Sequence, residues 1–251
     1  MSRNNRRKAR KNLARLLRFA ILAVFALMSF YYFSQSPFFA LAQIKVEGNR
    51  TLSPQMIADL TGVQKGTNLF DIDLEQVERR LLSHPLIEKV IVRRDWPHTL
   101  LITVSEREPC ALLLADNCFL VVDKNGFCLD KVDSLSSCMS FPIITGFHPV
   151  STSPGKQVGS DSVFLYVLDV LKNEAFQDFL SELNISDREN LIAYTRDGIP
   201  IFLGSAVDLP DKLNSALALI RNIDYRQKIE YVDVRVLEAP AVKEKMKTPR
   251  I

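Results

Sequence analysis

The sequence is poor in the side chains that enzymes most often use to bind metals and to move protons. Histidine occurs three times in 251 residues, at His84, His98 and His148, each beside a proline and far from the other two. A zinc site needs several convergent nitrogen or sulfur ligands, and no cysteine lies near these histidines at ligand spacing. The sequence therefore predicts no metal site.

Sequence patterns that carry catalysis are also missing. The Gly-x-Ser-x-Gly elbow of hydrolases and the His-Glu-x-x-His helix of metalloproteases do not occur. The segment Gly62–Thr67 superficially resembles a phosphate-binding loop, but it lacks the Gly-Lys-Ser/Thr ending and no strand precedes it. We therefore predict a protein without catalytic residues or a cofactor. The alternative is a membrane-tethered hydrolase whose acid pair lies outside any known motif.

Charge is absent or one-sided over the first 44 residues. Residues 1–18 carry eight basic side chains and no acidic one, and Phe19–Ile44 carry no charge at all. About 20 apolar residues cross a bilayer as a helix, and basic flanks stay in the cytoplasm. The pattern predicts a basic cytoplasmic arm over residues 1–18, a transmembrane helix over residues 19–36, and an ectodomain outside the cytoplasm.

A cleaved signal peptide is the alternative to an anchor. Ala40-Leu41-Ala42 has the small-x-small pattern that precedes a cleavage site. Against it, the basic region is unusually long, and the candidate cut lies nine residues beyond Phe33. Phe38–Glu47 also has the pattern of continuous extended chain, so cleavage would remove the start of a strand. We favour the uncleaved anchor.

The net charge of +3 depends on the N-terminal arm. Without its eight basic residues, the remainder has 24 Lys and Arg against 29 Asp and Glu. Nucleic acid binding needs a basic face, so the acidic ectodomain argues against it. The basic arm itself is typical of a topology signal, which stays on the cytoplasmic side next to the anionic lipids of the inner leaflet.

Four cysteines, Cys110, Cys118, Cys128 and Cys138, fall within 29 residues. An extracytoplasmic location permits disulfides, but sequence cannot give their connectivity. Buried free thiols and one or two disulfides both remain open.

Residues 38–108 predict a small α+β domain of order β-α-α-β-β. The predicted elements are a strand at Ile44–Asn49, a helix at Gln55–Leu60 capped by Ser53-Pro54, a helix with the buried stripe Leu74, Val77, Leu81 and Leu82, and strands at Ile87–Arg94 and Leu100–Val104. The caps, the helical stripe and the apolar alternation favour these assignments.

Residues 109–238 predict a mostly antiparallel β domain with flanking helices. Short strands are predicted at Ala111–Leu114, Phe119–Val122, Phe127–Leu129 and Phe141–Thr145, with Pro142 at an edge or a strand start. A helical pattern over Asp161–Leu183, either continuous or broken near Asn173, precedes a hairpin at Leu191–Leu203 and a helix from Asp211.

Glu230–Leu237 is predicted to be the last strand, and residues 239–251 a disordered tail. A last strand beside such a tail could be a sheet edge, which offers unpaired N–H and C=O groups to a partner strand. Pattern alone favours the other reading, an ordinary strand at Tyr231–Val236 that is paired on both sides.

Two groups of residues carry a resemblance to a known family. In the first domain they are Val46-Glu-Gly-Asn49, Asn68-Leu-Phe70, His84-Pro85, Val92-Arg93, Trp96-Pro97 and Glu106-Arg-Glu-Pro109. In the β domain they are Leu120–Gly126, Pro142–Gly146, Asp197-Gly198, Leu203-Gly204 and Tyr231–Arg235. With these residues the chain resembles the bacterial FtsQ/DivIB cell division proteins, which carry a POTRA domain. The resemblance covers residues 1–238 in order, including the basic arm and the single span.

The resemblance implies a non-catalytic divisome scaffold in the cell membrane, concentrated at the septum. It implies contacts of the POTRA domain and of the transmembrane segment with other division proteins. It also implies binding of FtsB, itself paired with FtsL, by strand addition beside the last strand. Carried over by position, the partner-binding residues are Tyr231, Val232, Asp233, Val234, Arg235, Val236, Leu237 and Glu238. Val236 stands where some relatives have an aromatic residue, which puts the binding register in question. The alternative function is a POTRA-bearing periplasmic assembly or secretion factor.

Overall fold

The computed structural model describes residues 3–115, 118–134, 140–221 and 229–245, with side chains from residue 15 onward. The chain divides into two compact units. Unit 1 comprises Met1–Leu82 and Lys89–Ser105, and unit 2 comprises Ser83–Glu88 and Glu106–Ile251. Each unit is described by itself below.

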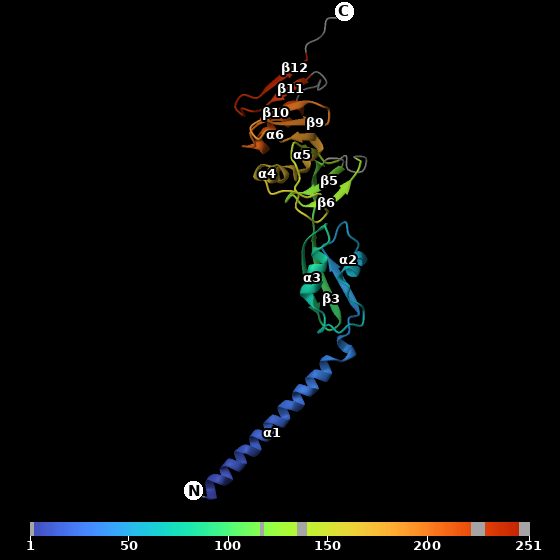
Figure 1. Cartoon of the computed structure of the whole chain (residues 1–251), viewed down its shortest axis with the longest axis vertical. Coiled ribbons are helices and arrows are strands. Elements are labelled where there is room, and N and C mark those ends of the chain that lie inside the picture. The colour runs from blue at the N-terminus through green and yellow to red at the C-terminus, as the bar shows by residue number, and fades with distance from the viewer. Residues whose placement is uncertain (1–2, 116–117, 135–139, 222–228, 246–251) are drawn as a thin grey trace, which may run out of the picture. The chain divides into compact units, whose positions relative to one another are not determined.

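Unit 1 begins with the long helix α1, Arg3–Ser34 (Figure 1). Its stretch Arg15–Ser34 has the length and composition needed to cross a bilayer, with a mean hydropathy of 1.9. This is the one such helix in the described part of the chain, which agrees with the predicted single span. The helix ends at Ser34, two residues before the predicted end of the span.

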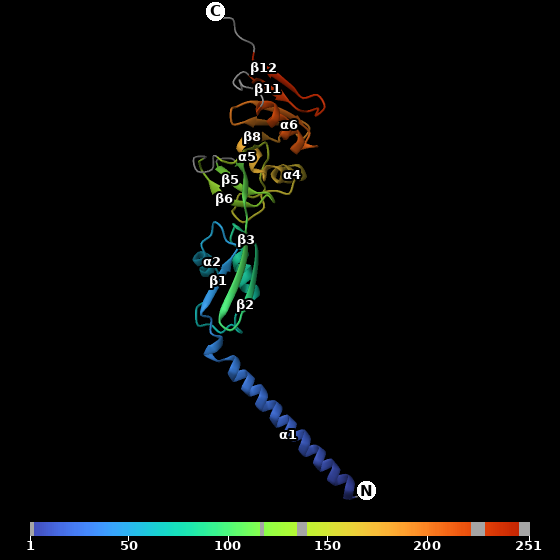
Figure 2. The same ribbon diagram turned by 180° about the vertical axis from the view of Figure 1, so that it is seen from behind.

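The folded part of unit 1 has the predicted order β-α-α-β-β. Its elements are β1 (Gln43–Glu47), α2 (Pro54–Thr61), α3 (Leu74–Leu82), β2 (Ile87–Asp95) and β3 (Thr99–Glu106). The sheet order is β1-β3-β2, with β1 parallel to the central β3. Figures 1 and 2 show α2 and α3 against one face of this sheet.

Local sequence signals explain these elements. Ser53 caps α2 by accepting a hydrogen bond from the Met56 N–H at 3.2 Å, and Gly62 ends α2 with a positive φ of 67°. Leu100, Ile102 and Val104 of β3 are all buried, as their alternation predicts. Leu82 is a correction: it lies in the last turn of α3 and is 48% exposed rather than part of the buried stripe.

The predicted extended chain at Phe38–Glu47 is wrong in its first half. Pro37–Phe39 form a short 3₁₀ helix, η1, because Ser36 accepts a hydrogen bond from the Phe38 N–H and Pro37 suits the first helical position. Leu41 then packs into unit 1 with 1% of its surface exposed. Its N–H donates to Thr67 O at 2.8 Å.

Unit 2 is built on one nine-stranded sheet of order β12-β11-β10-β9-β8-β7-β4-β5-β6. Five of its eight strand pairs are antiparallel and three are parallel, so the sheet is mixed. The strands are β4 (Pro109–Ala115), β5 (Cys118–Asp123), β6 (Cys128–Val132), β7 (Ile143–Thr145), β8 (Leu180–Asn184), β9 (Leu191–Thr195), β10 (Pro200–Gly204), β11 (Ile229–Asp233) and β12 (Ala241–Glu244).

Three helices pack on the sheet within the described residues of unit 2: α4 (Ser162–Leu171), α5 (Glu174–Phe179) and α6 (Leu209–Arg221) (Figure 1). Asp161 caps α4 and Asn173 caps α5, so the helical pattern is interrupted at Asn173 as predicted. The predicted continuation of the helix to Leu183 is wrong. Leu180–Asn184 form β8, because strand pairing with β7 and β9 outweighs their helical spacing.

Pro142 lies at a strand start, not at an edge. It directly precedes β7, which is an interior strand paired in parallel with β4 and β8. Proline has no N–H to donate. Because Pro142 lies outside β7, its missing N–H removes no hydrogen bond from the pairing of that strand. The Pro142 carbonyl accepts a hydrogen bond from the Leu112 N–H at 2.9 Å.

The C-terminal end differs from the prediction in two ways. β11 ends at Asp233 rather than Leu237, and Ala241–Glu244, predicted to be disordered, form β12. β12 pairs antiparallel with β11, with Tyr231 opposite Lys243 and Val232 opposite Val242. The prediction failed because β12 is four residues long and has a single large apolar side chain, so its pattern does not indicate a strand.

Candidate partner-binding edge

The C-terminal end of the sheet in unit 2 is the candidate functional site. β11 is hydrogen-bonded on both sides, to β10 in parallel and to β12 in antiparallel orientation. β12 is the terminal strand of the sheet among the described residues. An edge strand presents a row of main-chain N–H and C=O groups that another chain can pair with. β12, rather than β11, therefore offers that row.

Few side-chain contacts hold β12 in place. Val242 is half-buried and packs against the main core of unit 2, while Ala241, Lys243 and Glu244 are exposed. The Lys243 ammonium lies 3.2 Å from Glu230 Oε1 and 5.4 Å from the centre of the Tyr231 ring. Both partners of the ion pair are exposed, so solvent weakens it. The strand is held mainly by its main-chain ladder.

An aromatic and charged surface lies beside this edge. The Tyr231 ring meets the Phe202 ring edge-to-face, with 5.3 Å between centroids. Two residues after Tyr231, Asp233 Oδ2 accepts a hydrogen bond from the Arg235 guanidinium at 2.6 Å. This hydrogen bond lowers the pKa of Asp233 and raises the pKa of Arg235. The Arg235 Cγ lies 3.3 Å from where a Cβ on Gly204 would stand, so glycine gives Arg235 room here.

The eight residues predicted to bind a partner divide into two groups. Val232 and Val234 are fully buried, and the Val234 N–H donates to Phe202 O at 3.0 Å. Arg235, Val236 and Glu238 are exposed in the connection between β11 and β12, and Val236 is 57% exposed. Over Tyr231–Asp233, β11 is paired on both sides, which agrees with the interpretation that the pattern alone favours rather than with an open edge at these residues. The role of the segment in partner binding stays a prediction.

The residues that sequence reasoning missed are Ala241–Glu244. One weak signal was available in the sequence. The segment has a single valine, Val242, with Pro240 two residues before it and the oppositely charged Lys243 and Glu244 directly after it. Proline and charged side chains are features by which natural edge strands avoid unwanted pairing. They are equally common in unstructured tails, so the signal was ambiguous.

The three cysteines of unit 2 that the structure describes are structural. Cys110, Cys118 and Cys128 are free and buried, and Cys138 lies outside the described residues. Burial raises the pKa of Cys110 to about 12 and that of Cys128 to about 11. No group of three or more His, Cys, Asp or Glu residues in the described chain could hold a metal ion.

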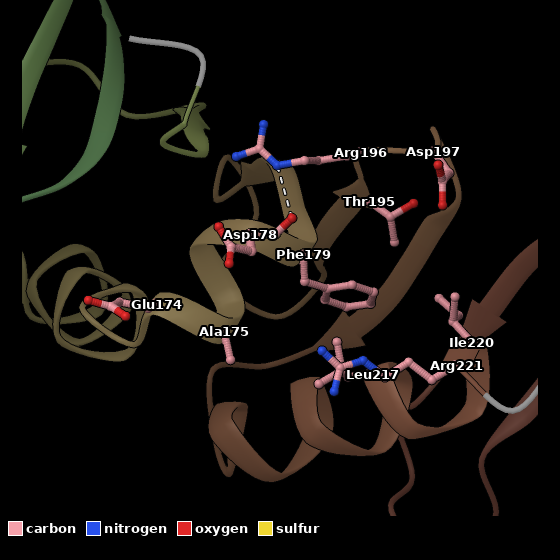
Figure 3. A pocket seen from close by; sticks show the side chains of 10 residues that line it. All are labelled: Glu174, Ala175, Asp178, Phe179, Thr195, Arg196, Asp197, Leu217, Ile220 and Arg221. Carbon is pink, nitrogen blue, oxygen red and sulfur yellow. Dashed lines mark hydrogen bonds between the residues drawn. The ribbon is translucent and has the colours of Figure 1, made fainter.

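A cavity of about 450 Å³ lies between α5, the turn after β9 and the end of α6 (Figure 3). Its lining mixes acids and bases, including Asp178, Arg196 and Arg221. Arg196 donates to Asp178 O at 2.9 Å, the contact drawn in Figure 3, and to Ser140 O at 2.6 Å. Arg196 thus joins the hairpin turn to neighbouring backbone, which is a structural role.

One buried ion pair was not predicted. Arg107 Nη1 donates to Asp123 Oδ2 at 2.7 Å, with 13% and 3% of the two side chains exposed. Asp123 Oδ1 also accepts from the N–H groups of Asn125 and Phe127, which forms the turn between β5 and β6. The Arg107 guanidinium lies 3.9 Å from the centre of the Phe127 ring. The pair fixes the start of the unit 2 sheet.

Comparison with known proteins gives two family matches in chain order. Residues 39–107 match the FtsQ-type POTRA domain, and residues 111–235 match the C-terminal domain of cell division protein FtsQ/DivIB. Cell division protein FtsQ of Syntrophotalea carbinolica is 30% identical over 215 residues, which are 83% of this chain and 75% of that protein.

Two further relatives agree with these matches. Cell division protein FtsQ of Geobacter sp. is 29% identical over 84% of this chain and 78% of its own length. Cell division protein DivIB of Clostridium acetobutylicum is 25% identical over 79% of this chain and 80% of its own length. The match to the C-terminal family ends at residue 235, before β12 begins.

Proposed function

The chain belongs to the FtsQ/DivIB family of cell division proteins, and we propose that it is a non-catalytic scaffold that joins partner proteins at the division septum. In this proposal α1 is the single membrane span and the basic arm lies in the cytoplasm. The folded part of unit 1 and the whole of unit 2 lie outside the cytoplasm. The partner is FtsB, paired with FtsL, and an FtsB strand adds to the C-terminal end of the unit 2 sheet.

The observation that carries the proposal is the position of β12 at the end of the sheet. Strand addition draws its affinity from main-chain hydrogen bonds and its specificity from neighbouring side chains. β11 cannot accept a further strand while β12 is in place, because both of its sides are paired. The partner strand therefore pairs with the outer side of β12, Ala241–Glu244.

The segment Tyr231–Glu238 then acts as a neighbour of the docking strand. Val236 offers exposed apolar surface, and Arg235 and Glu238 offer charges of opposite sign. Tyr231 stands opposite Lys243 in the ladder. Val232 and Val234 make no side-chain contact with the partner in this arrangement, because both are 0% exposed.

Two adjacent proline substitutions in β12 test strand addition. Alternate residues of a strand direct their N–H groups to opposite sides. Of the variants Lys243→Pro and Glu244→Pro, one therefore removes an N–H that faces the partner strand, and we call it the outward variant. The other removes an N–H that faces β11, and we call it the inward variant. Both residues are exposed, so neither change removes a buried side chain. Loss of one donor costs about 1 kcal/mol, and the bulk of the ring adds to this, so we expect about a tenfold weaker complex for the outward variant.

The measurement is the dissociation constant of the full-length chain for the FtsB–FtsL complex in nanodiscs. Circular dichroism and the unfolding midpoint serve as controls for the fold. Supporting results are weakened binding with an unchanged midpoint for the outward variant, and a lowered midpoint for the inward one. Wild-type affinity in both variants would exclude pairing along β12.

The cellular role has a separate test. Depletion of the protein should give filamentous cells, and a fluorescent fusion should collect at midcell. Normal division together with an even membrane signal would contradict a septal scaffold, whatever the binding measurement shows.

A further inference from the structure

A cluster of aromatic rings lies where α1 meets the folded part of unit 1. The Phe39 ring is at its centre, with centroids 5.2 Å from Phe33, 5.1 Å from Phe70 and 5.7 Å from Trp96. Phe70 and Trp96 also meet each other at 4.7 Å, and Phe38 meets Phe39 at 5.2 Å. We call these five side chains, Phe33, Phe38, Phe39, Phe70 and Trp96, the junction cluster.

The junction cluster is assembled from four separate segments. Phe33 lies in the last turn of α1, Phe38 and Phe39 in η1, Phe70 in the loop before α3, and Trp96 in the turn after β2. The fold brings them together at one end of the small sheet.

Main-chain and side-chain hydrogen bonds hold these segments together. The Leu69 N–H donates to Phe39 O at 2.9 Å, and Asn68 Nδ2 donates to Ser34 O at 2.6 Å, the last residue of α1. Arg94 donates from Nε to Leu69 O at 2.6 Å and from Nη2 to Ile72 O at 2.7 Å. The loop that presents Phe70 is therefore fixed to β2 on one side and to the end of α1 on the other.

Much of this aromatic surface is open to solvent. Phe38 is 58% exposed, Trp96 48% and Phe70 43%. An exposed group of large apolar side chains on a soluble surface marks an interaction site. Aromatic rings, and tryptophan above all, are also the side chains enriched at the boundary between lipid headgroups and acyl chains.

The position of the junction cluster identifies its partner. The apolar stretch of α1 ends at Ser34, one residue after the cluster member Phe33, and Ser34 O accepts the hydrogen bond from Asn68 in the loop that presents Phe70. Any bilayer crossed by α1 has its outer boundary at this point of the chain. A protein partner would have to reach the same rings at the lipid surface, whereas lipid is already present there.

We propose that Phe38, Phe70 and Trp96 insert into the outer boundary of the bilayer and fix unit 1 to the membrane surface. The inference depends on α1 spanning the membrane, which is part of the proposed function. An aromatic patch of this kind binds at the headgroup and acyl-chain boundary at a depth of about 5–10 Å. It would limit how far unit 1 can tilt about the end of the span.

The sequence provides its own probe, because Trp96 is the single tryptophan of the chain. The experiment uses the full-length protein in phosphatidylcholine and phosphatidylglycerol vesicles that carry bromine atoms at different depths along the acyl chains. We expect Trp96 fluorescence to shift to shorter wavelength, and to lose about half of its intensity with bromine near the headgroups. Bromine at the bilayer centre should quench it less.

The matched control moves the tryptophan from the turn after β2 into β2 itself. Ile91 lies in β2 and is also 48% exposed. It lies five residues from Trp96, a distance of about 16 Å along an extended chain. The double variant Trp96→Phe with Ile91→Trp keeps an aromatic ring in the junction cluster, and its tryptophan should not be quenched by any brominated lipid.

The outcomes separate this inference from the proposed function. A chain that fails to float with the vesicles would contradict the membrane span itself. A chain that floats but shows Trp96 unquenched, or quenched no more than the tryptophan at position 91, would overturn the insertion of the junction cluster alone. Strong quenching of Trp96 with none at position 91 supports it.

Discussion

Two regions of the unit 2 sheet, β12 at one end and the β4–β5 pair next to the last strand β6 at the other, are built on different principles. At the β4–β5 end both faces of the sheet are covered. Leu113 and Leu120 pack into the main core, while Leu112 and Val121 pack into a second cluster with Leu86 and Phe141. At the other end, β12 has three exposed side chains and only Val242 half-buried.

This difference separates the residues that hold the fold from those available to a partner. A strand buried on both faces is stabilised by its side chains, so its sequence is strongly restricted. A strand held by its main-chain ladder leaves its side chains and its outer edge free, and it can be recognised by another strand. Changes at the β4–β5 end should therefore lower stability, whereas changes at β12 should lower binding.

The largest effect is expected for Asp123→Ala at the buried end. The substitution leaves Arg107 without its carboxylate and the turn after β5 without its acceptor. Removing one partner of a buried ion pair costs about 3–5 kcal/mol of unfolding free energy. Chemical denaturation of the full-length chain in detergent, followed by circular dichroism, measures the loss.

The matched control is Glu230→Ala, which breaks the exposed pair with Lys243 at the opposite end. Exposed pairs contribute about 0–1 kcal/mol, so this variant should unfold close to wild type. Equal losses from the two substitutions would contradict the contrast between the two ends.

The second-largest effect is expected for the reactivity of the thiols at the β4–β5 end, which should be low in the folded protein. A thiol reacts as its thiolate, and the raised pKa values of Cys110 (about 12) and Cys128 (about 11) suppress that form near neutral pH. Relative to an unfolded chain, their thiolate fraction falls by about a hundredfold or more. Alkylation by iodoacetamide at pH 8, read by mass spectrometry of peptides, should modify both residues only after denaturant is added. Rapid modification in the folded protein would show that this end opens.

The contrast also explains which elements the sequence could predict. β3 was found because Leu100, Ile102 and Val104 alternate with less buried residues, and α2 because Ser53 and Gly62 mark its ends. In these elements the local pattern and the tertiary environment agree. β8 was missed because Leu180–Leu183 continue a helical spacing, and only pairing with two neighbouring strands makes them extended.

β12 and the Arg107–Asp123 pair were missed for a different reason. The information that defines them is not local: β12 is a strand because β11 offers a free side, and Asp123 meets Arg107 from 16 residues away. The same holds for the junction cluster, whose rings come from four segments. The resemblance pointed to Tyr231–Glu238, and the strand pairing moves the proposed docking strand to the neighbouring β12.

The smallest effect sharpens the comparison at the exposed end. The pKa of Asp233 is lowered by the hydrogen bond from Arg235, so ionised Asp233 stabilises the fold at pH values above its ordinary pKa of about 4, and protonation removes this contribution as the pH falls below that value. Arg235 stays charged throughout. Between pH 6 and 8 the pair is therefore constant, and neither stability nor partner binding should change on its account. Unfolding midpoints of the wild type and of Asp233→Asn, measured from pH 7 down to pH 3, should differ slightly at pH 7 and converge in acid. A difference that persists unchanged to pH 3 would show that the ion pair does not stabilise this end, and that the substituted amide acts through another contact.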